Sequence, residues 1–154
     1  MKYTDENEFR KANVFGKGDF NKDYAQYFIG SSYLNPLAAC GEPKLYLANV
    51  TFEPGCRNNW HIHHASKGGG QLLLCTAGEG WYQEWGKEPV ELKPGTVITI
   101  PPEVKHWHGA KKDSWFSHIA FGIPGENCTN EWLEEVSDAE YEHAAEKFQN
   151  GTSE

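Results

Sequence analysis

The amino-acid sequence predicts an all-β domain, either a sandwich or a barrel, between an irregular N-terminal arm and a helical C-terminal tail. Short runs with strand character recur at regular spacing through the middle of the chain, and Gly and Pro residues separate them. The length agrees, because 154 residues form one ordinary domain with a sizeable core. No internal repeat or linker divides the chain. We therefore place the arm at residues 1–26, the barrel at 27–123 and the tail at 124–154.

The arm is polar and contains two glycines, Gly16 and Gly18, which favour irregular structure. The segments that follow are rich in apolar and β-branched residues and end at Gly or Pro turns, as strands do. Strands are expected at residues 27–34, 45–52, 71–76, 81–85, 90–92, 96–100 and 115–121.

The tail changes from strand to helix periodicity. Ser137 and Glu140 have the spacing of a capping box, in which each residue bonds the backbone N–H of the other. Tyr141, Ala144 and Ala145 then recur at spacings that share one helical face. We expect residues 130–150 to be helical. Its many acidic residues are typical of a solvated outer face or, less often, of an acidic docking surface.

Charge and composition exclude several classes of partner. The chain has 14 Lys and Arg against 22 Asp and Glu, a net charge of −8, which argues against nucleic acids and anionic membranes. The longest clean apolar run, 72–75, is too short to span a bilayer. No secretory signal is visible, and no two of the four cysteines form a C-x-x-C pair. We expect a cytoplasmic protein with reduced thiols and a small-molecule partner.

Histidines form two pairs with the same spacing. His61 and His63 are two residues apart, as are His106 and His108. Because side chains in a strand alternate between faces, both members of a pair point the same way. Two imidazoles on one face can chelate a divalent metal ion. The alternative is that both pairs lie on the surface beside neighbouring tryptophans.

The spacing of these histidines resembles the two sequence motifs of the cupin family. The first motif is Gly, five residues, His-x-His, a short gap, Glu, six residues and Gly, and its positions here are Gly55, His61, His63, Gln71 and Gly78. The second is Gly, five residues and Pro-x-Gly-x-x-His, and its positions here are Gly95, Pro101, Glu103 and His106. The resemblance covers about residues 27–123. It implies a cupin jelly-roll β-barrel, also called a double-stranded β-helix.

The resemblance also implies a metal site at the centre of the barrel. Its ligands would be His61, His63, His106 and, at the position where most cupins have Glu, Gln71. Three imidazoles and an amide oxygen are neutral, so a bound ion would keep its full charge and be a better electrophile. The gap between His63 and Gln71 is longer than usual. If the gap turns Gln71 away, three histidines and more open positions remain.

Further segments, including 51–57, 105–110 and 117–120, resemble small single-domain cupins. These include the bacterial hydroxynitrile lyases and cupins related to carboxymuconolactone decarboxylase. This resemblance implies one divalent ion, manganese or iron with zinc or nickel as alternatives, and a homodimer. It implies roles beside the metal for His108 and His118, either of which can act as a general base near neutral pH. It places Asn58 in the substrate pocket, where those lyases have Thr.

We expect large aromatic residues, including Trp81 and Trp107, to line the pocket. The function favoured is a metal-dependent lyase or decarboxylase-like enzyme that acts on a small carbonyl or aromatic compound through Lewis-acid catalysis. Two alternatives are a metal-dependent dioxygenase and a cupin that binds a small molecule without catalysis. The fold can host all three.

Overall fold

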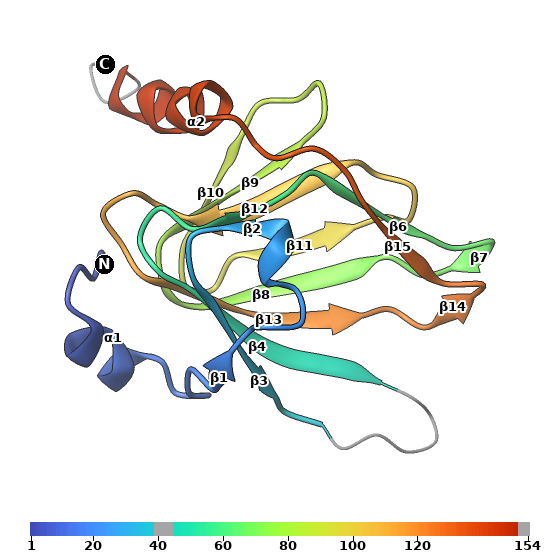
Figure 1. The fold of residues 1–154 in the computed structure, drawn as a ribbon, viewed down its shortest axis with the longest axis horizontal. Coiled ribbons are helices and arrows are strands. Elements are labelled where there is room, and N and C mark those ends of the chain that lie inside the picture. Colours follow the sequence, from blue (N-terminus) through green and yellow to red (C-terminus); the bar gives the residue numbers. More distant parts are fainter. Residues whose placement is uncertain (39–44, 151–154) are drawn as a thin grey trace.

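The computed structural model describes residues 1–38 and 45–150, in which two antiparallel sheets face each other as a β-barrel (Figure 1). The strand order of the first sheet is β1 (Asp19–Phe20), β3 (Ser32–Pro36), β4 (Tyr46–Phe52), β13 (Phe116–Gly122), β8 (Gln71–Gly78) and β11 (Val97–Ile100). The strand order of the second is β10 (Val90–Leu92), β9 (Gly80–Glu84), β12 (His106–Ala110), β5 (Arg57–Asn58) and β2 (Phe28–Ile29). The all-β fold expected from the sequence is confirmed.

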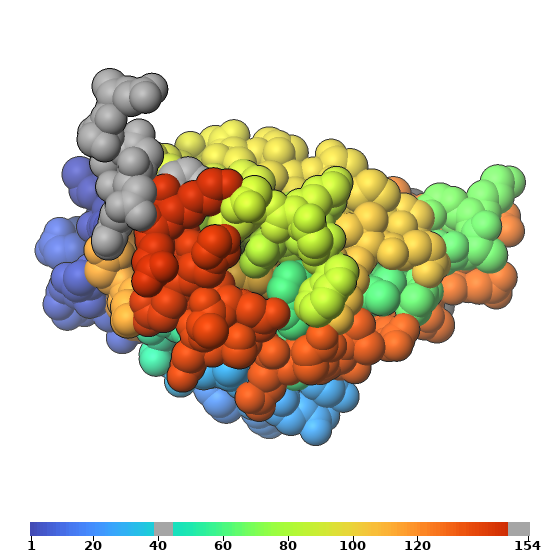
Figure 2. All heavy atoms as spheres, turned by 90° about the horizontal axis from the view of Figure 1, so that it is seen from above, coloured from blue at the N-terminus to red at the C-terminus, as the bar shows by residue number. Residues whose placement is uncertain are grey.

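Three further pairings extend the second sheet and one end of the barrel. β6 (His61–His64) pairs with β12 and with β15 (Thr129–Trp132). A separate two-stranded sheet joins β7 (Lys67–Gly68) to β14 (Gly125–Glu126). Figure 2 shows this small sheet projecting at one end, while the C-terminal helix α2 (Asp138–Asn150) lies over the β9–β10 region.

The main core fills the space between the two sheets. Phe52 from β4 and Phe116 from β13 are fully buried, and their rings stack with centroids 5.9 Å apart. Strand alternation supplies the remaining inward side chains, which are Val50, Leu73, Cys75, Tyr82, Leu92, Ile100 and Ala120. Burial of this apolar surface is the main favourable term in folding. Polar side chains line the remaining end of the barrel.

A second apolar cluster lies outside the barrel, beneath α2. Trp60, Trp81 and Trp107 pack there against Val136, Tyr141 and Ala144. The Tyr141 hydroxyl donates to the Ala110 carbonyl oxygen at 2.6 Å and ties the helix to β12. The expected capping box is present, since the Ser137 N–H donates to Glu140 at 2.8 Å and the Glu140 N–H donates to Ser137 at 3.2 Å.

Three expected elements differ from the structure. The arm contains a helix, α1 (Glu6–Ala12), whose first turn is capped by the Asp5 side chain. The strand expected at 27–34 is two strands, because Gly30 takes a φ of +84° and the chain passes from the second sheet to the first. The tail helix begins at Asp138 instead of residue 130, and β15 occupies the preceding segment.

Each of the other expected strands is present, and its bounds lie within two residues of the expected ones. Cys40 lies outside the described residues, and the other three cysteines are free thiols, as expected. In the part of the chain that the structure describes, no helix has the length and apolar character needed to cross a membrane.

Candidate metal centre

Three histidines converge at the polar end of the barrel. His61 and His63 come from β6, and His106 comes from the neighbouring β12, where it pairs directly with His61. One ring nitrogen from each lies within 4.8 Å of the corresponding atoms of the other two. His61 and His63 therefore share a face, as strand alternation predicts. The geometry suits a divalent metal ion.

Hydrogen bonds fix which nitrogen of each ring faces the centre. The Nδ1 atoms of His61 and His106 lie 2.8 and 2.9 Å from the carbonyl oxygens of Asn59 and Val104. A carbonyl only accepts, so each Nδ1 carries the proton and donates it. His63 Nδ1 contacts the Asn130 side-chain oxygen at 2.7 Å in the same manner. Each Nε2 atom thus presents a lone pair, which is the arrangement that metal-binding histidines use.

Three buried acceptor atoms at this centre have no hydrogen-bond partner among the residues that the structure describes. They are Nε2 of His63, Nε2 of His106 and Oε1 of Gln71. Burying an unpaired acceptor costs free energy, and a cation bound among them would remove that cost. The residues present therefore fit a divalent metal ion with the ligand set expected from the sequence.

Burial keeps these imidazoles neutral. It lowers the pKa of His61 well below its ordinary value, assisted by the nearby His106 and His63 rings. It also lowers the pKa of His106, to about 4, and that of His63. Neutral histidine is the form that binds metal, so the site is prepared to bind an ion at neutral pH.

The long gap between His63 and Gln71 is folded, and it leaves Gln71 in the cavity wall. Within the gap, β7 pairs with β14, and Gly68, Gly69 and Gly70 all have positive φ. A Cβ atom at Gly70 would lie 2.3 Å from the Ile100 carbonyl oxygen, so only glycine fits there. The tight glycine segment returns the chain to the start of β8, where Gln71 pairs with Ile100 and Gly122.

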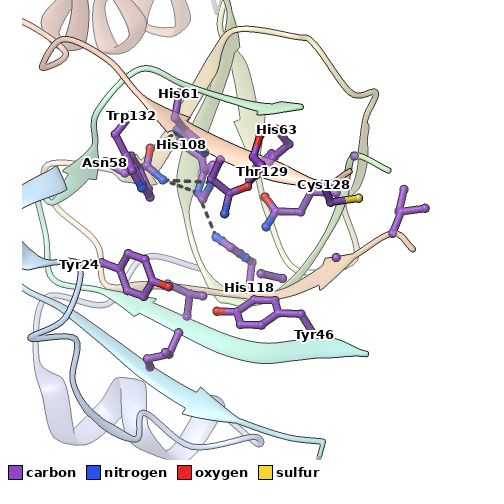
Figure 3. A pocket seen from close by; sticks show the side chains of 18 of the residues that line it. Tyr24, Tyr46, Asn58, His61, His63, His108, His118, Cys128, Thr129 and Trp132 are labelled. Atoms are coloured by element: carbon purple, nitrogen blue, oxygen red, sulfur yellow. Dashed lines mark hydrogen bonds between the residues drawn. The ribbon is translucent and has the colours of Figure 1, made fainter. Parts of the chain in front are cut away.

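A second histidine pair lies beside the three. His118 on β13 and His108 on β12 face each other across the barrel, with His118 Nε2 3.1 Å from His108 Nδ1 (Figure 3). The Asn58 side-chain nitrogen lies 3.1 Å from His108 Nε2. Burial lowers the pKa of His108 well below its ordinary value and that of His118 to about 4. Both rings are therefore neutral near pH 7, and burial disfavours the protonated form of each.

A cavity of about 360 Å³ connects the two groups to the surface. Its walls include His61, His63, Gln71, Asn58, His108 and His118, together with apolar side chains of Phe28, Leu34, Val50, Ala120, Ile123 and Trp132. Figure 3 shows Tyr24 and Tyr46 on the opposite side of the cavity from His61 and His63. Among the described residues that line it, none is Asp, Glu, Lys or Arg. Such a cavity suits an uncharged, largely apolar molecule.

The two tryptophans expected in the pocket lie elsewhere. Trp107 sits between His106 and His108 on β12, and alternation turns it to the outer face, where Trp81 joins it beneath α2. Trp132 lines the cavity instead, with its ring 4.6 Å from that of His61. The sequence did not indicate this role, because residue 132 fell inside the expected helix.

Sequence analysis also missed a polar clamp at the cavity rim. His64 lies between two carboxylates, with Nδ1 2.5 Å from Glu103 and Nε2 2.6 Å from Glu131. These hydrogen bonds raise the pKa of His64. The clamp joins β6 to β15 and to the loop before β12. It therefore links three segments at the cavity rim.

Comparison with known proteins agrees with this fold. The sequence pattern of the cupin domain matches residues 48–117. A protein named (R)-mandelonitrile lyase from Granulicella tundricola is 39% identical over 121 residues, which are 78% of this chain and 89% of the lyase.

Solved structures show the same fold. A cupin-like protein from Thermotoga maritima is 37% identical, with a TM-score of 0.71 over 85% of this chain and 96% of that chain. A DMSP lyase from Ruegeria pomeroyi is 17% identical, with a TM-score of 0.53 over 75% of this chain and 56% of that chain. The latter likeness concerns the fold alone.

Proposed function

This chain belongs to the cupin family, and from that premise we propose that it is a metal-dependent lyase that cleaves a small, uncharged α-hydroxynitrile into a carbonyl compound and cyanide. One observation carries the proposal: His61, His63 and Gln71 of the candidate metal centre and the His108–His118 pair line the same cavity. The similarity to (R)-mandelonitrile lyase supports this reaction class and an aromatic substrate.

The three histidines and Gln71 would hold the ion, for which we propose manganese or iron. A bound divalent ion supplies Lewis-acid stabilisation of negative charge that develops on a substrate oxygen. The four donors carry no charge of their own, so they do not weaken that effect as a carboxylate would. Gln71 also contributes an amide oxygen that has no other partner.

The second histidine pair would move the proton. Cleavage requires that the substrate hydroxyl lose its proton and that the bond to the nitrile carbon break. The electron pair of that bond leaves with cyanide, which takes up one proton, so the products are an aldehyde or ketone and hydrogen cyanide. His108 and His118 line the cavity, and the unprotonated ring nitrogen of either would take the hydroxyl proton and return it to the leaving group.

The cavity walls would select and orient the substrate. Phe28, Leu34, Val50 and Trp132 give apolar contact, and each Å² of apolar surface removed from water contributes about 25 cal/mol. No Asp, Glu, Lys or Arg is among the described lining residues, so the walls themselves offer a substrate apolar and neutral polar contacts.

Turnover of racemic mandelonitrile by the manganese- and iron-loaded chain tests the proposal. We expect release of benzaldehyde and cyanide, strongly reduced in His108→Ala and unchanged in His143→Ala. His143 is an exposed histidine of α2 outside the site, so its variant controls for the loss of an imidazole. Oxygen consumption without cyanide release would instead favour a dioxygenase. Binding without turnover in both metal forms would favour a small-molecule-binding cupin.

A further inference from the structure

The mouth of the cavity carries two tyrosine hydroxyls that the proposed reaction does not use. Tyr24 and Tyr46 both line the cavity, and their residues are 42% and 51% exposed. Figure 3 shows their rings entering from different elements, with the two hydroxyl groups directed toward each other. Partial burial raises the pKa of Tyr46, and the nearby Tyr24 adds to the rise. Neither hydroxyl has a hydrogen-bond partner among the residues that the structure describes, so both are available to a ligand.

Strand geometry directs Tyr46 into the cavity. Tyr46 is the first residue of β4, and Val50, four residues later on the same face, also lines the cavity. The cross-strand partner of Tyr46 on β13 is Gly122. A Cβ atom at Gly122 would lie 3.3 Å from the Tyr46 Cβ and 3.9 Å from its Cδ1. The absence of a side chain at Gly122 therefore leaves room for the Tyr46 ring on the inner face of the sheet.

A row of aromatic rings leads from the metal centre to Tyr24. The Trp132 ring lies 4.6 Å from that of His61, and it stacks on Tyr27 at 4.6 Å with an interplanar angle of 3°. Tyr24 immediately precedes the 3₁₀ turn η1 (Ala25–Tyr27), and its ring lies 6.3 Å from the same Trp132 ring. This wall gives an aromatic substrate a continuous apolar surface that ends at the Tyr24 hydroxyl.

The metal centre and the two hydroxyls are close enough for one small molecule to reach both. Gln71, Gly122 and Tyr46 are cross-strand neighbours on β8, β13 and β4. Adjacent strands lie about 4.8 Å apart, so the Gln71 and Tyr46 backbones are about 10 Å apart. Val50 and Ala120 line the cavity with apolar surface, and its described lining has no Asp, Glu, Lys or Arg. The cavity therefore suits an aromatic ring with a neutral polar group at each end.

We propose that Tyr24 and Tyr46 form a polar subsite for a hydroxyl group on the substrate ring, so that the preferred substrates are aromatic hydroxynitriles with a ring hydroxyl at position 3 or 4. This preference among substrates rests on the lyase function proposed above, whereas binding of a ring hydroxyl does not. A phenol hydroxyl both donates and accepts a hydrogen bond. One tyrosine of the pair can therefore accept from the ring hydroxyl while the other donates to its oxygen.

The exposure of the two tyrosines limits the size of the effect. A hydrogen bond to the substrate there replaces one to water, so its net contribution is modest. We expect KM to be about five-fold lower for the better of 3- and 4-hydroxymandelonitrile than for mandelonitrile. The contact is remote from the reacting carbon and is equally strong before and during the reaction, so kcat should change little.

Tyrosine-to-phenylalanine variants test the subsite, because each keeps the ring and removes the hydroxyl. The Tyr24→Phe/Tyr46→Phe double variant should lose the preference for hydroxylated substrates and keep the wild-type KM for mandelonitrile. Tyr27→Phe is the matched control, since Tyr27 belongs to the same segment and is not among the cavity-lining residues. Equal KM values for all three substrates in the wild-type protein would overturn the proposal. A preference that persists in the double variant would also overturn it.

A binding measurement separates this proposal from the lyase function. Calorimetry of the zinc-loaded protein with benzyl alcohol and with 3- and 4-hydroxybenzyl alcohol requires no turnover. We expect one hydroxylated alcohol to bind about five-fold more tightly in wild type and in Tyr27→Phe, and no difference in the double variant. If this result is obtained but no metal form releases cyanide, the lyase function fails and the subsite stands. If cyanide is released and neither assay shows a preference, the subsite fails alone.

Discussion

Glu103 accepts a 2.5 Å hydrogen bond from His64 while its backbone has a φ of +68°, a conformation that favours glycine. The second cupin motif has Gly at this position. In this chain Glu, which carries a carboxylate side chain, adopts a backbone conformation that glycine adopts with less strain. The Glu103 side chain also accepts from the Ala65 N–H at 3.0 Å. Both contacts connect the Glu103 loop to the end of β6 at the rim of the cavity.

Substitutions at Glu103 should separate backbone strain from the carboxylate contacts. Glu103→Gly loses the contacts and relieves the strain, whereas Glu103→Ala loses the contacts and keeps the strain. We expect the Gly variant to be more stable than the Ala variant by about 1 kcal/mol, measured by urea unfolding. Equal stability of the two would show that the left-handed backbone carries no cost.

The His64 clamp should depend on pH in a defined direction. Hydrogen bonds that His64 donates to the Glu131 and Glu103 carboxylates raise the pKa of His64 in the folded state. Its contribution to stability is therefore complete below the unfolded-state pKa of about 6.5 and is lost as pH rises through the raised folded-state value. The difference in unfolding free energy between wild type and His64→Gln should be larger at pH 5 than at about pH 9. A difference that grows with pH would contradict this assignment.

The buried histidines should make the stability of the folded protein depend on pH in the opposite direction. Burial lowers the pKa of His106 and His118 to about 4 each. Their contribution to stability is present above about pH 6.5 and is lost as pH falls toward 4, because the unfolded chain binds protons first. Metal-free wild type should lose stability over this range in thermal unfolding. His118→Gln should show a shallower loss, and an identical slope would contradict the burial effect.

Replacing the neutral ligand Gln71 with a charged residue should strengthen metal binding and lower the catalytic rate. Gln71→Glu adds a carboxylate at the centre, so we expect tighter metal binding by competitive titration and a lower kcat, because the ion loses part of its charge. Gln71→Leu removes the donor and should weaken binding. Metal affinity that is the same in Gln71→Glu, Gln71→Leu and wild type would mean that residue 71 is not a ligand.

Substitution by Phe should have different effects at Trp132 and at Trp107. Trp132 lines the cavity, so Trp132→Phe should raise KM for an aromatic substrate. Trp107 lies outside it and donates to Gln83 at 3.1 Å, so Trp107→Phe should lower stability by about 1 kcal/mol and leave KM unchanged. A change in KM for Trp107→Phe alone would contradict the placement of both residues.

Much of the barrel could be predicted from local pattern, because strand alternation and Gly or Pro turns are short-range signals. The two His-x-His pairs indicated the metal centre for the same reason. The helix at Glu6–Ala12 was also visible in principle, since Asp5 and Glu8 have the spacing of a helix cap. Alternation likewise implied that Trp107, between two inward histidines, points outward.

Other features depend on contacts between distant segments. Trp132 and Asn130 reach the site because β15 pairs with β6, and that pairing has no local signature. The His64 clamp joins residues 39 and 67 positions apart in the chain. The contacts among Asn58, His108 and His118 bring three strands together, and no local pattern in the sequence indicates them.

Elemental analysis of the purified protein tests the central claim, a divalent metal centre built from His61, His63, Gln71 and His106, most directly. Wild type and His143→Ala should each carry about one equivalent of manganese or iron after reconstitution and desalting, and a His61→Ala/His106→Ala double variant should carry none. Folded wild-type protein that retains no metal, or a double variant that retains as much as wild type, would contradict the account.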